Sequence, residues 1–189
     1  ASSFWLLLTV WQQGEPLVFQ SGTWIAPIGI SFVGDLLSGT LVVMSQLVIL
    51  FGMLYGISCN DKCARYPTFF PLFLTLTVGL SGAFLTGDLF NLFVFFEVLL
   101  IASYGLMIHS GGRERMRAGL QYVVMNLAGS TLFLFALGTL YASTGTLNIA
   151  DLAQRIADIP PEETALVRVA AILLMIVFAL KAALFPVQF

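Results

Sequence analysis

The stretch TGDLFNLFVFFEVLLIASY, residues 86–104, sets a single carboxylate, Glu97, inside sequence that is otherwise apolar. If Asp88 caps a helix that begins at Leu89, Glu97 lies roughly 13 Å below that cap, because an α-helix rises 1.5 Å per residue. This depth is about half of a hydrocarbon core of ~30 Å. A carboxylate there costs on the order of 2.5 kcal/mol or more, so it needs a partner, a water-filled cavity or a proton. Function is therefore expected on this helix.

The composition places the chain in the membrane class. Of its 189 residues, 59% are hydrophobic and only 10% are charged, and the mean hydropathy is +0.96, whereas soluble domains carry about 25% charged residues. The formal charge of -2 gives no argument for nucleic acid, and we expect the lipid bilayer as the surrounding partner. The first residue is Ala1 and the last, Phe189, lies inside an apolar run, so we expect a fragment of a longer protein.

Uncharged runs of about twenty residues predict an all-α polytopic membrane protein. The predicted membrane segments are residues 1–11 (the end of a truncated helix), 36–57, 69–86, 88–108 with Glu97, 118–142, and 164–189 (a broken, truncated helix with Lys181). Residues 12–35 hold several Gly and Pro between β-favouring pieces, which predicts an outward loop with a short β-hairpin at the surface. Residues 147–158 show helical spacing of apolar side chains, which predicts an amphipathic helix on the membrane surface.

The basic residues give the orientation. They fall in two alternate loops, which the positive-inside rule places in the cytoplasm. These residues are Lys62, Arg65, Arg113, Arg115 and Arg117. The opposite loops hold only Arg155 against several acidic residues, so we expect them to face outward.

Two ionisable residues of opposite sign remain inside predicted spans, Glu97 and Lys181. Lys181 lies about 20 Å into its helix counted from Arg168, a depth comparable to that of Glu97. Pro186 lacks the N–H of a regular helix, so we expect a break there, beside the lysine, able to hold water and an ion. Burial disfavours a charged lysine and a nearby carboxylate favours it, so the pair is predicted to load and release a proton.

A structural interpretation stands beside this one. Glu97 and Lys181 would then form a strut between two helices, or Lys181 would extend its charge to the membrane interface.

Other polar residues have simpler interpretations. Asp88, with Asn91 three residues later, is predicted to cap a helix, with a role in ion access as the alternative. His109 lies at the predicted cytoplasmic edge, where it either relays protons or titrates in solvent. Cys59 and Cys63 lack the further ligands of a zinc site, so they are interpreted as free thiols, and we expect neither a metal nor a cofactor.

Three stretches carry a family resemblance: PIGISFVGDLLSG (residues 27–39), GDLFNLFVFFEVLLIASY (87–104) and FALKAALFP (178–186). They resemble the D subunit of Mrp-type multisubunit cation/proton antiporters, whose wider family includes antiporter-like subunits of respiratory complex I and membrane-bound hydrogenases. The resemblance implies an inverted-repeat antiporter-like fold with a proline-broken helix near Lys181, of which this chain supplies most of the first repeat. It also implies that Glu97 and Lys181 match the first repeat's ionisable pair, whereas Gln188 stands where such subunits often carry His or Tyr.

The same resemblance implies the setting and the function. We expect a multi-pass protein of the bacterial inner membrane that works with other subunits of a complex and moves protons against a monovalent cation such as Na⁺. As a component of a secondary transporter it would not itself be an enzyme. One alternative is the proton-pumping module of a redox-driven NADH:quinone oxidoreductase or hydrogenase, and a second is a non-transporting membrane scaffold.

Overall fold

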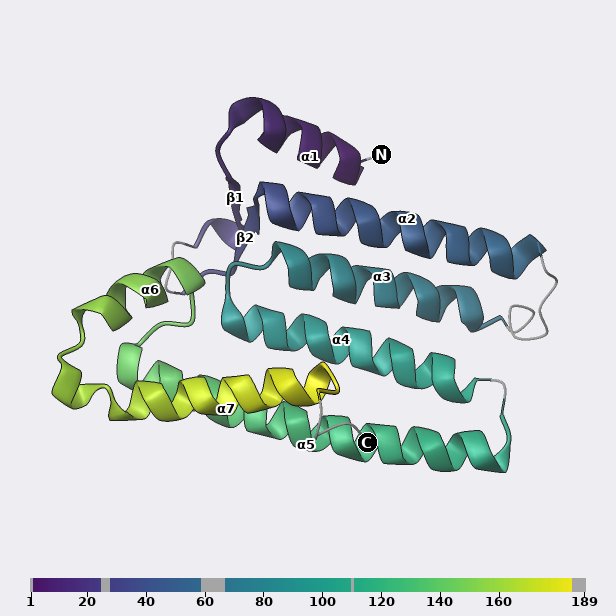
Figure 1. The fold of residues 1–189 in the computed structure, drawn as a ribbon. Helices are drawn as coiled ribbons and strands as arrows, with labels where there is room; N and C mark the ends of the chain where they lie inside the picture. Colours follow the sequence, from purple (N-terminus) through teal and green to yellow (C-terminus); the bar gives the residue numbers. More distant parts are fainter. Residues whose placement is uncertain (1, 25–27, 59–66, 110, 185–189) are drawn as a thin grey trace.

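Long helices laid side by side dominate this computed structural model, which describes residues 2–24, 28–58, 67–109 and 111–184. Helices α1 to α5 follow one another across the layer and α7 lies against α5 (Figure 1). The elements are α1 (Ser2–Gln13), β1 (Leu17–Gln20), η1 (Ser21–Thr23), β2 (Ser31–Gly34), α2 (Leu36–Ser58), α3 (Phe69–Leu85), α4 (Leu89–Ile108), α5 (Arg113–Thr144), α6 (Ile149–Asp158), η2 (Pro161–Glu163) and α7 (Ala165–Lys181). The predicted all-α membrane fold class is confirmed.

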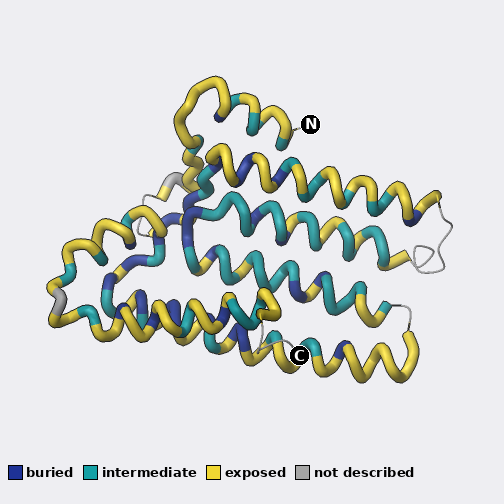
Figure 2. Tube along the Cα trace, viewed as in Figure 1, coloured by how far each residue is buried: buried dark blue, intermediate teal, exposed yellow. Residues whose placement is uncertain are grey.

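Within the described residues, three helices are long and apolar enough to cross a bilayer: α2, α4 and α5. Helix α3 is a shorter apolar helix of 17 residues. The outward surfaces of the layer are largely exposed (Figure 2), and many of the exposed side chains are large and apolar. Apolar exposure on this scale suits a hydrocarbon solvent, in which helices satisfy all their backbone hydrogen bonds internally.

Helix α5 is longer than the sequence predicted. It begins at Arg113, not at residue 118, so the arginine cluster forms its first turns and not a loop. Arg, Glu and Met are good helix formers, and hydropathy marks where a helix enters lipid and not where it begins.

Residues 59–66, between α2 and α3, lie outside the described residues. They include the two predicted free thiols and two of the predicted cytoplasmic basic residues: Cys59, Cys63, Lys62 and Arg65.

The predicted hairpin is formed by β1 and β2. The two strands pair antiparallel, with Leu17 opposite Gly34 and Gln20 opposite Ser31. The hairpin lies at the same end of the molecule as α6 and the beginnings of α2 and α4 (Figure 1).

A buried polar junction ties this end together. The side chain of Asn148 donates to Ser31 Oγ at 2.8 Å, although the two residues are 117 positions apart. Gly87 N donates to the Ser31 carbonyl at 2.8 Å, and Ile149 N donates to the Gly87 carbonyl at 2.9 Å. The hairpin, the α3–α4 turn and the beginning of α6 therefore meet at one set of satisfied hydrogen bonds, as buried polar groups require.

The packing core lies between α4, α5 and α7. Phe133, Leu137 and Val177 are buried there, and Phe93 and Phe96 of α4 pack against them. The Phe93 and Phe133 rings meet edge to face at 5.7 Å, a favoured aromatic geometry. This core fixes the position of α4, which carries Glu97, against α5 and against α7, which carries Lys181.

Candidate functional site

Helix α4 positions Glu97 through its cap. Asp88 begins the helix, as predicted, and its carboxylate accepts from Asn91 N at 2.9 Å. The Asn91 side chain donates back to Thr86 Oγ1 at 2.9 Å. From this fixed start, Glu97 falls near the middle of the 20-residue helix.

Glu97 has a hydrogen-bond partner on the neighbouring helix. The hydroxyl of Ser130, on α5, donates to Glu97 Oε1. Ser130 is buried and Glu97 is half-buried. A buried carboxyl group needs a hydrogen-bond partner, and the Ser130 hydroxyl supplies one from the neighbouring helix.

Lys181 is the last residue of α7, which ends alongside the middle of α4 and α5 (Figure 1). Its Nζ is buried and has no hydrogen-bond partner among the described residues. The ammonium stands 5.3 Å from the centroid of the Phe96 ring, within the range of a cation–π interaction. Lys181 and Glu97 interact electrostatically, but within the described part of the chain the ion pair observed is between Arg155 and Asp151.

The end of α7 is a Schellman motif. Leu184 N donates to the Ala179 carbonyl at 3.0 Å and Ala183 N donates to the Leu180 carbonyl at 3.1 Å. Ala183 adopts the left-handed conformation that this motif needs, with φ 49°. The helix thus ends at Lys181, before Pro186, and Pro186 itself lies outside the described residues.

Ala183→Gly is expected to stabilise the protein by about 1 kcal/mol, because glycine adopts the left-handed conformation without the steric cost that a Cβ carries. Thermal unfolding of the purified full-length protein would measure the change. The matched control is Ala182→Gly, one residue earlier at φ -85°, where glycine brings no such relief. Equal effects of the two substitutions would contradict this account of the helix end.

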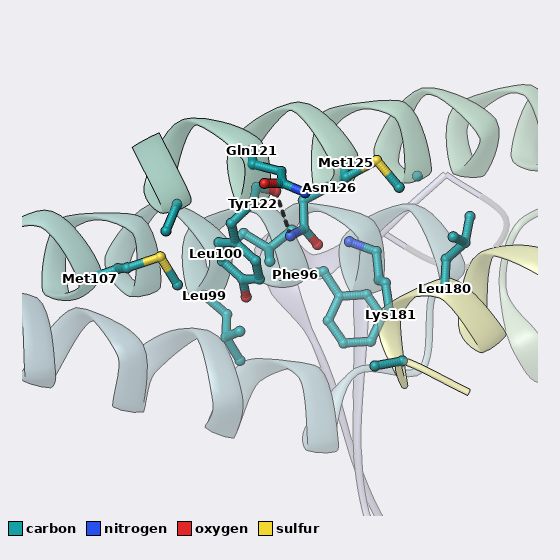
Figure 3. A pocket seen from close by; sticks show the side chains of 13 residues that line it. Phe96, Leu99, Leu100, Met107, Gln121, Tyr122, Met125, Asn126, Leu180 and Lys181 are labelled. Atoms are coloured by element: carbon teal, nitrogen blue, oxygen red, sulfur yellow. Dashed lines mark hydrogen bonds between the residues drawn. The ribbon is translucent and has the colours of Figure 1, made fainter. Parts of the chain in front are cut away.

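A cavity of about 480 Å³ opens beside the end of α7. It is lined by Phe96 and Leu100 from α4, Tyr122 and Asn126 from α5, and Lys181. In Figure 3 the Lys181 side chain points into this space and the ring of Phe96 lies along its stem. Its lining is mostly apolar, but the volume has room for water and the polar groups of Tyr122, Asn126 and Lys181 offer it hydrogen-bond partners.

The structure brings some of the predicted site residues together and separates others. Glu97 and Lys181 share the middle of the layer. Asp88 lies in the polar junction at one end of α4 and His109 lies at the other end, where its Nδ1 is 2.8 Å from the Leu106 carbonyl oxygen. Among the described residues no group of His, Cys, Asp or Glu is arranged to hold a metal ion.

Sequence reasoning missed the polar residues of α5 that complete the site. Tyr122, Asn126 and Ser130 are spaced four residues apart, so they lie on one face of the helix. This spacing inside an uncharged span was the signal that could have found them. The Asn126 side chain donates to the Tyr122 carbonyl at 2.9 Å, which orients it at the cavity wall (Figure 3).

Comparison with known proteins agrees with this architecture. The chain is 41% identical over 187 residues to the D subunit of the Na⁺/H⁺ antiporter of Alkalihalophilus pseudofirmus, covering 99% of this chain and 37% of that protein. It superposes on a chain of the Mrp complex from Dietzia sp. DQ12-45-1b with a TM-score of 0.87 and 34% identity, covering 99% of this chain and 34% of that one.

A second solved structure is nearly as similar. This is the membrane-bound sulfane sulfur reductase, an archaeal respiratory membrane complex, with a TM-score of 0.86 and 34% identity, covering 98% of this chain and 37% of that one. The chain thus spans little more than a third of the length of the proteins it matches, 34% to 37%.

The family model described as "NADH:quinone oxidoreductase/Mrp antiporter, TM" matches residues 86–189, which include both Glu97 and Lys181. The resemblance to the D subunit of Mrp-type antiporters is confirmed by the relatives. The chain belongs to the NADH:quinone oxidoreductase/Mrp antiporter transmembrane family.

Proposed function

We propose that this chain forms part of a proton-translocating subunit of a multisubunit monovalent cation/proton antiporter in the bacterial inner membrane. Glu97 and Lys181 load and release the proton. The observation that carries the proposal is the buried Lys181 Nζ, which has no hydrogen-bond partner among the described residues and lies next to a cavity within electrostatic reach of Glu97.

The chemistry follows from the two charges. Burial of an ammonium that has no hydrogen-bond partner among the described residues is costly, so Lys181 is suited to releasing a proton into the adjacent cavity. A charged Glu97 opposes this release, and protonation or movement of Glu97 favours it. Water in the cavity carries the proton to and from Nζ. Asp88, His109 and Pro186 remain accessory candidates, of which His109 lies at the end of α4 predicted to face the cytoplasm.

The partners are other subunits of a membrane complex, protons and a monovalent cation such as Na⁺. Support comes from the similar proteins, which include the D subunit of a Na⁺/H⁺ antiporter and a chain of the Mrp complex. The protein would be a component of a secondary transporter and not an enzyme.

A redox-driven proton pump is the second candidate, and one observation favours it. The membrane-bound sulfane sulfur reductase matches this chain almost as well as the Mrp complex does. In that case electron transfer elsewhere in the complex would drive the same helices.

The driving force separates these candidates. The full-length protein within its complex, reconstituted in vesicles, is expected to move protons when a Na⁺ or K⁺ gradient is imposed without any electron donor or quinone. A pH-sensitive dye inside the vesicles measures the flux, and protein-free vesicles are the control. Flux that appears only with an electron donor would favour the redox pump. No flux under either condition would favour a scaffold.

A further inference from the structure

Ser130 uses its hydroxyl differently from its neighbours on α5. The adjacent Thr131 donates to the Leu127 carbonyl of its own helix, and Thr139 does the same with Phe135. Ser130 instead donates across to Glu97 Oε1 on α4. Ser130 is only 4% exposed, so little water reaches its hydroxyl.

Lys181, which Glu97 would otherwise attract, lies nearby on α7. Lys181 Nζ is buried without a hydrogen-bond partner among the described residues, and it interacts with Glu97 electrostatically. Removed from water, an ammonium and a carboxylate gain strongly from direct contact with good geometry. Here the Glu97 carboxylate accepts from Ser130, and Lys181 Nζ lies 5.3 Å from the centroid of the Phe96 ring.

We infer that Ser130 is a positioning residue that holds the Glu97 carboxylate against α5, so that Glu97 and Lys181 act on each other through space without closing into a direct ion pair. This inference rests on the proposed function. It adds that Ser130 sets how strongly Glu97 and Lys181 interact. A closed ion pair would keep the proton on Lys181, whereas the held-apart pair lets it leave.

Other titratable groups around Glu97 do not offer the same restraint. Tyr104, on its own helix, interacts with Glu97 electrostatically, and Tyr122 of α5 interacts in turn with Tyr104. Helix α3, which packs on the other side of α4, has no titratable side chain in its sequence. On α7 the other charged group is Arg168, near the opposite end of the helix from Lys181.

Ser130→Ala is expected to shift the pH profile of transport by about one pH unit in the alkaline direction. Without the hydroxyl, the carboxylate moves to Lys181, and the closed pair releases its proton only at higher pH. The size follows from a hydrogen bond to a charged group, which is worth about one to two pH units. The measurement is cation-driven proton flux across a pH series, with the full complex in vesicles.

Three further variants separate positioning from packing. Ser130→Thr keeps the hydroxyl and should retain the wild-type profile. Ser130→Cys keeps the size with a weaker donor, so it should give a smaller shift in the same direction. The matched control is Thr131→Ala, which removes an adjacent exposed hydroxyl bonded within α5 and should leave the profile unchanged.

An unshifted profile in an assembled, active Ser130→Ala complex would overturn the inference. If that variant does not assemble, the Cys variant decides, and an unshifted profile there overturns it as well. The proposed function fails separately, when Glu97→Gln and Lys181→Met both transport like the wild type. Loss of transport in those two variants combined with an unshifted Ser130→Ala would overturn only the role of Ser130.

Discussion

Lys181→Met is expected to reduce cation-driven proton transport at least about tenfold, equivalent to about 1.4 kcal/mol of barrier or more. Methionine keeps the length and the packing against Phe96 but cannot carry a proton. Flux is measured on the full complex in vesicles, with assembly checked by purification. The matched control is Arg168→Met, which removes an exposed positive charge from the same helix and should leave transport within about twofold.

Lys181→Arg distinguishes a proton carrier from a strut. Arginine keeps the positive charge and the attraction to Glu97, but it does not release its proton in a protein. If Lys181 only braces α7 against α4, the arginine variant should transport normally. If Lys181 carries the proton, the arginine variant should be as inactive as the methionine variant.

Glu97→Gln complements this test from α4. Glutamine keeps the shape and can still accept from Ser130, but it removes the charge that interacts with Lys181. Transport is expected to fall by about an order of magnitude, since one pH unit of proton affinity corresponds to a tenfold change in occupancy. Wild-type flux in both Glu97→Gln and Lys181→Met would leave the pair without a role in transport.

Much of the fold was predictable because lipid imposes strict rules on sequence. A crossing helix needs about twenty apolar residues, so α2 could be located from an uncharged run and α4 from an apolar run in which Glu97 is the one charged residue. Depth along each helix follows from a fixed rise, which placed Glu97 and Lys181 at similar levels. The beginning of α5 and the Schellman motif that ends α7 were not predictable in this way, since a basic first turn and a helix-end motif are local structures that hydropathy does not encode.

The site was only half predictable for a related reason. Charges in an apolar helix are conspicuous because they are costly, so Glu97 and Lys181 are evident in the sequence. A hydroxyl costs little free energy in such a helix, since it usually donates to a carbonyl of its own helix, as Thr131 and Thr139 do. Nothing in composition says that Ser130 donates across to Glu97, because that choice depends on how α4 packs against α5. The polar junction at the hairpin end is hidden for the same reason.

A substitution at the contact between α3 and α4 is expected to have the second large effect, because Gly79 of α3 lies directly against the backbone of α4. A Cβ at Gly79 would lie 2.8 Å from Leu99 N, 2.9 Å from Leu99 Cβ and 3.0 Å from Leu99 Cα. None of these atoms is the end of a flexible side chain, so α4 itself would have to move. Gly79→Ala is therefore expected to destabilise the protein by roughly 1–3 kcal/mol, the usual cost of overpacking.

The same substitution elsewhere should have the opposite sign. At Gly138, in α5, an added Cβ meets nothing within 4 Å, so Gly138→Ala should stabilise the helix by roughly 0.5–1 kcal/mol through backbone entropy. Thermal unfolding of the purified full-length protein compares the two variants. Because Leu99 lies only two residues beyond Glu97, displacement of α4 in Gly79→Ala should also weaken the bond from Ser130 and shift the pH profile of transport. A Gly79→Ala protein as stable as Gly138→Ala would mean that α4 is not held by this contact, and the position of Glu97 would then depend on α5 and α7 alone.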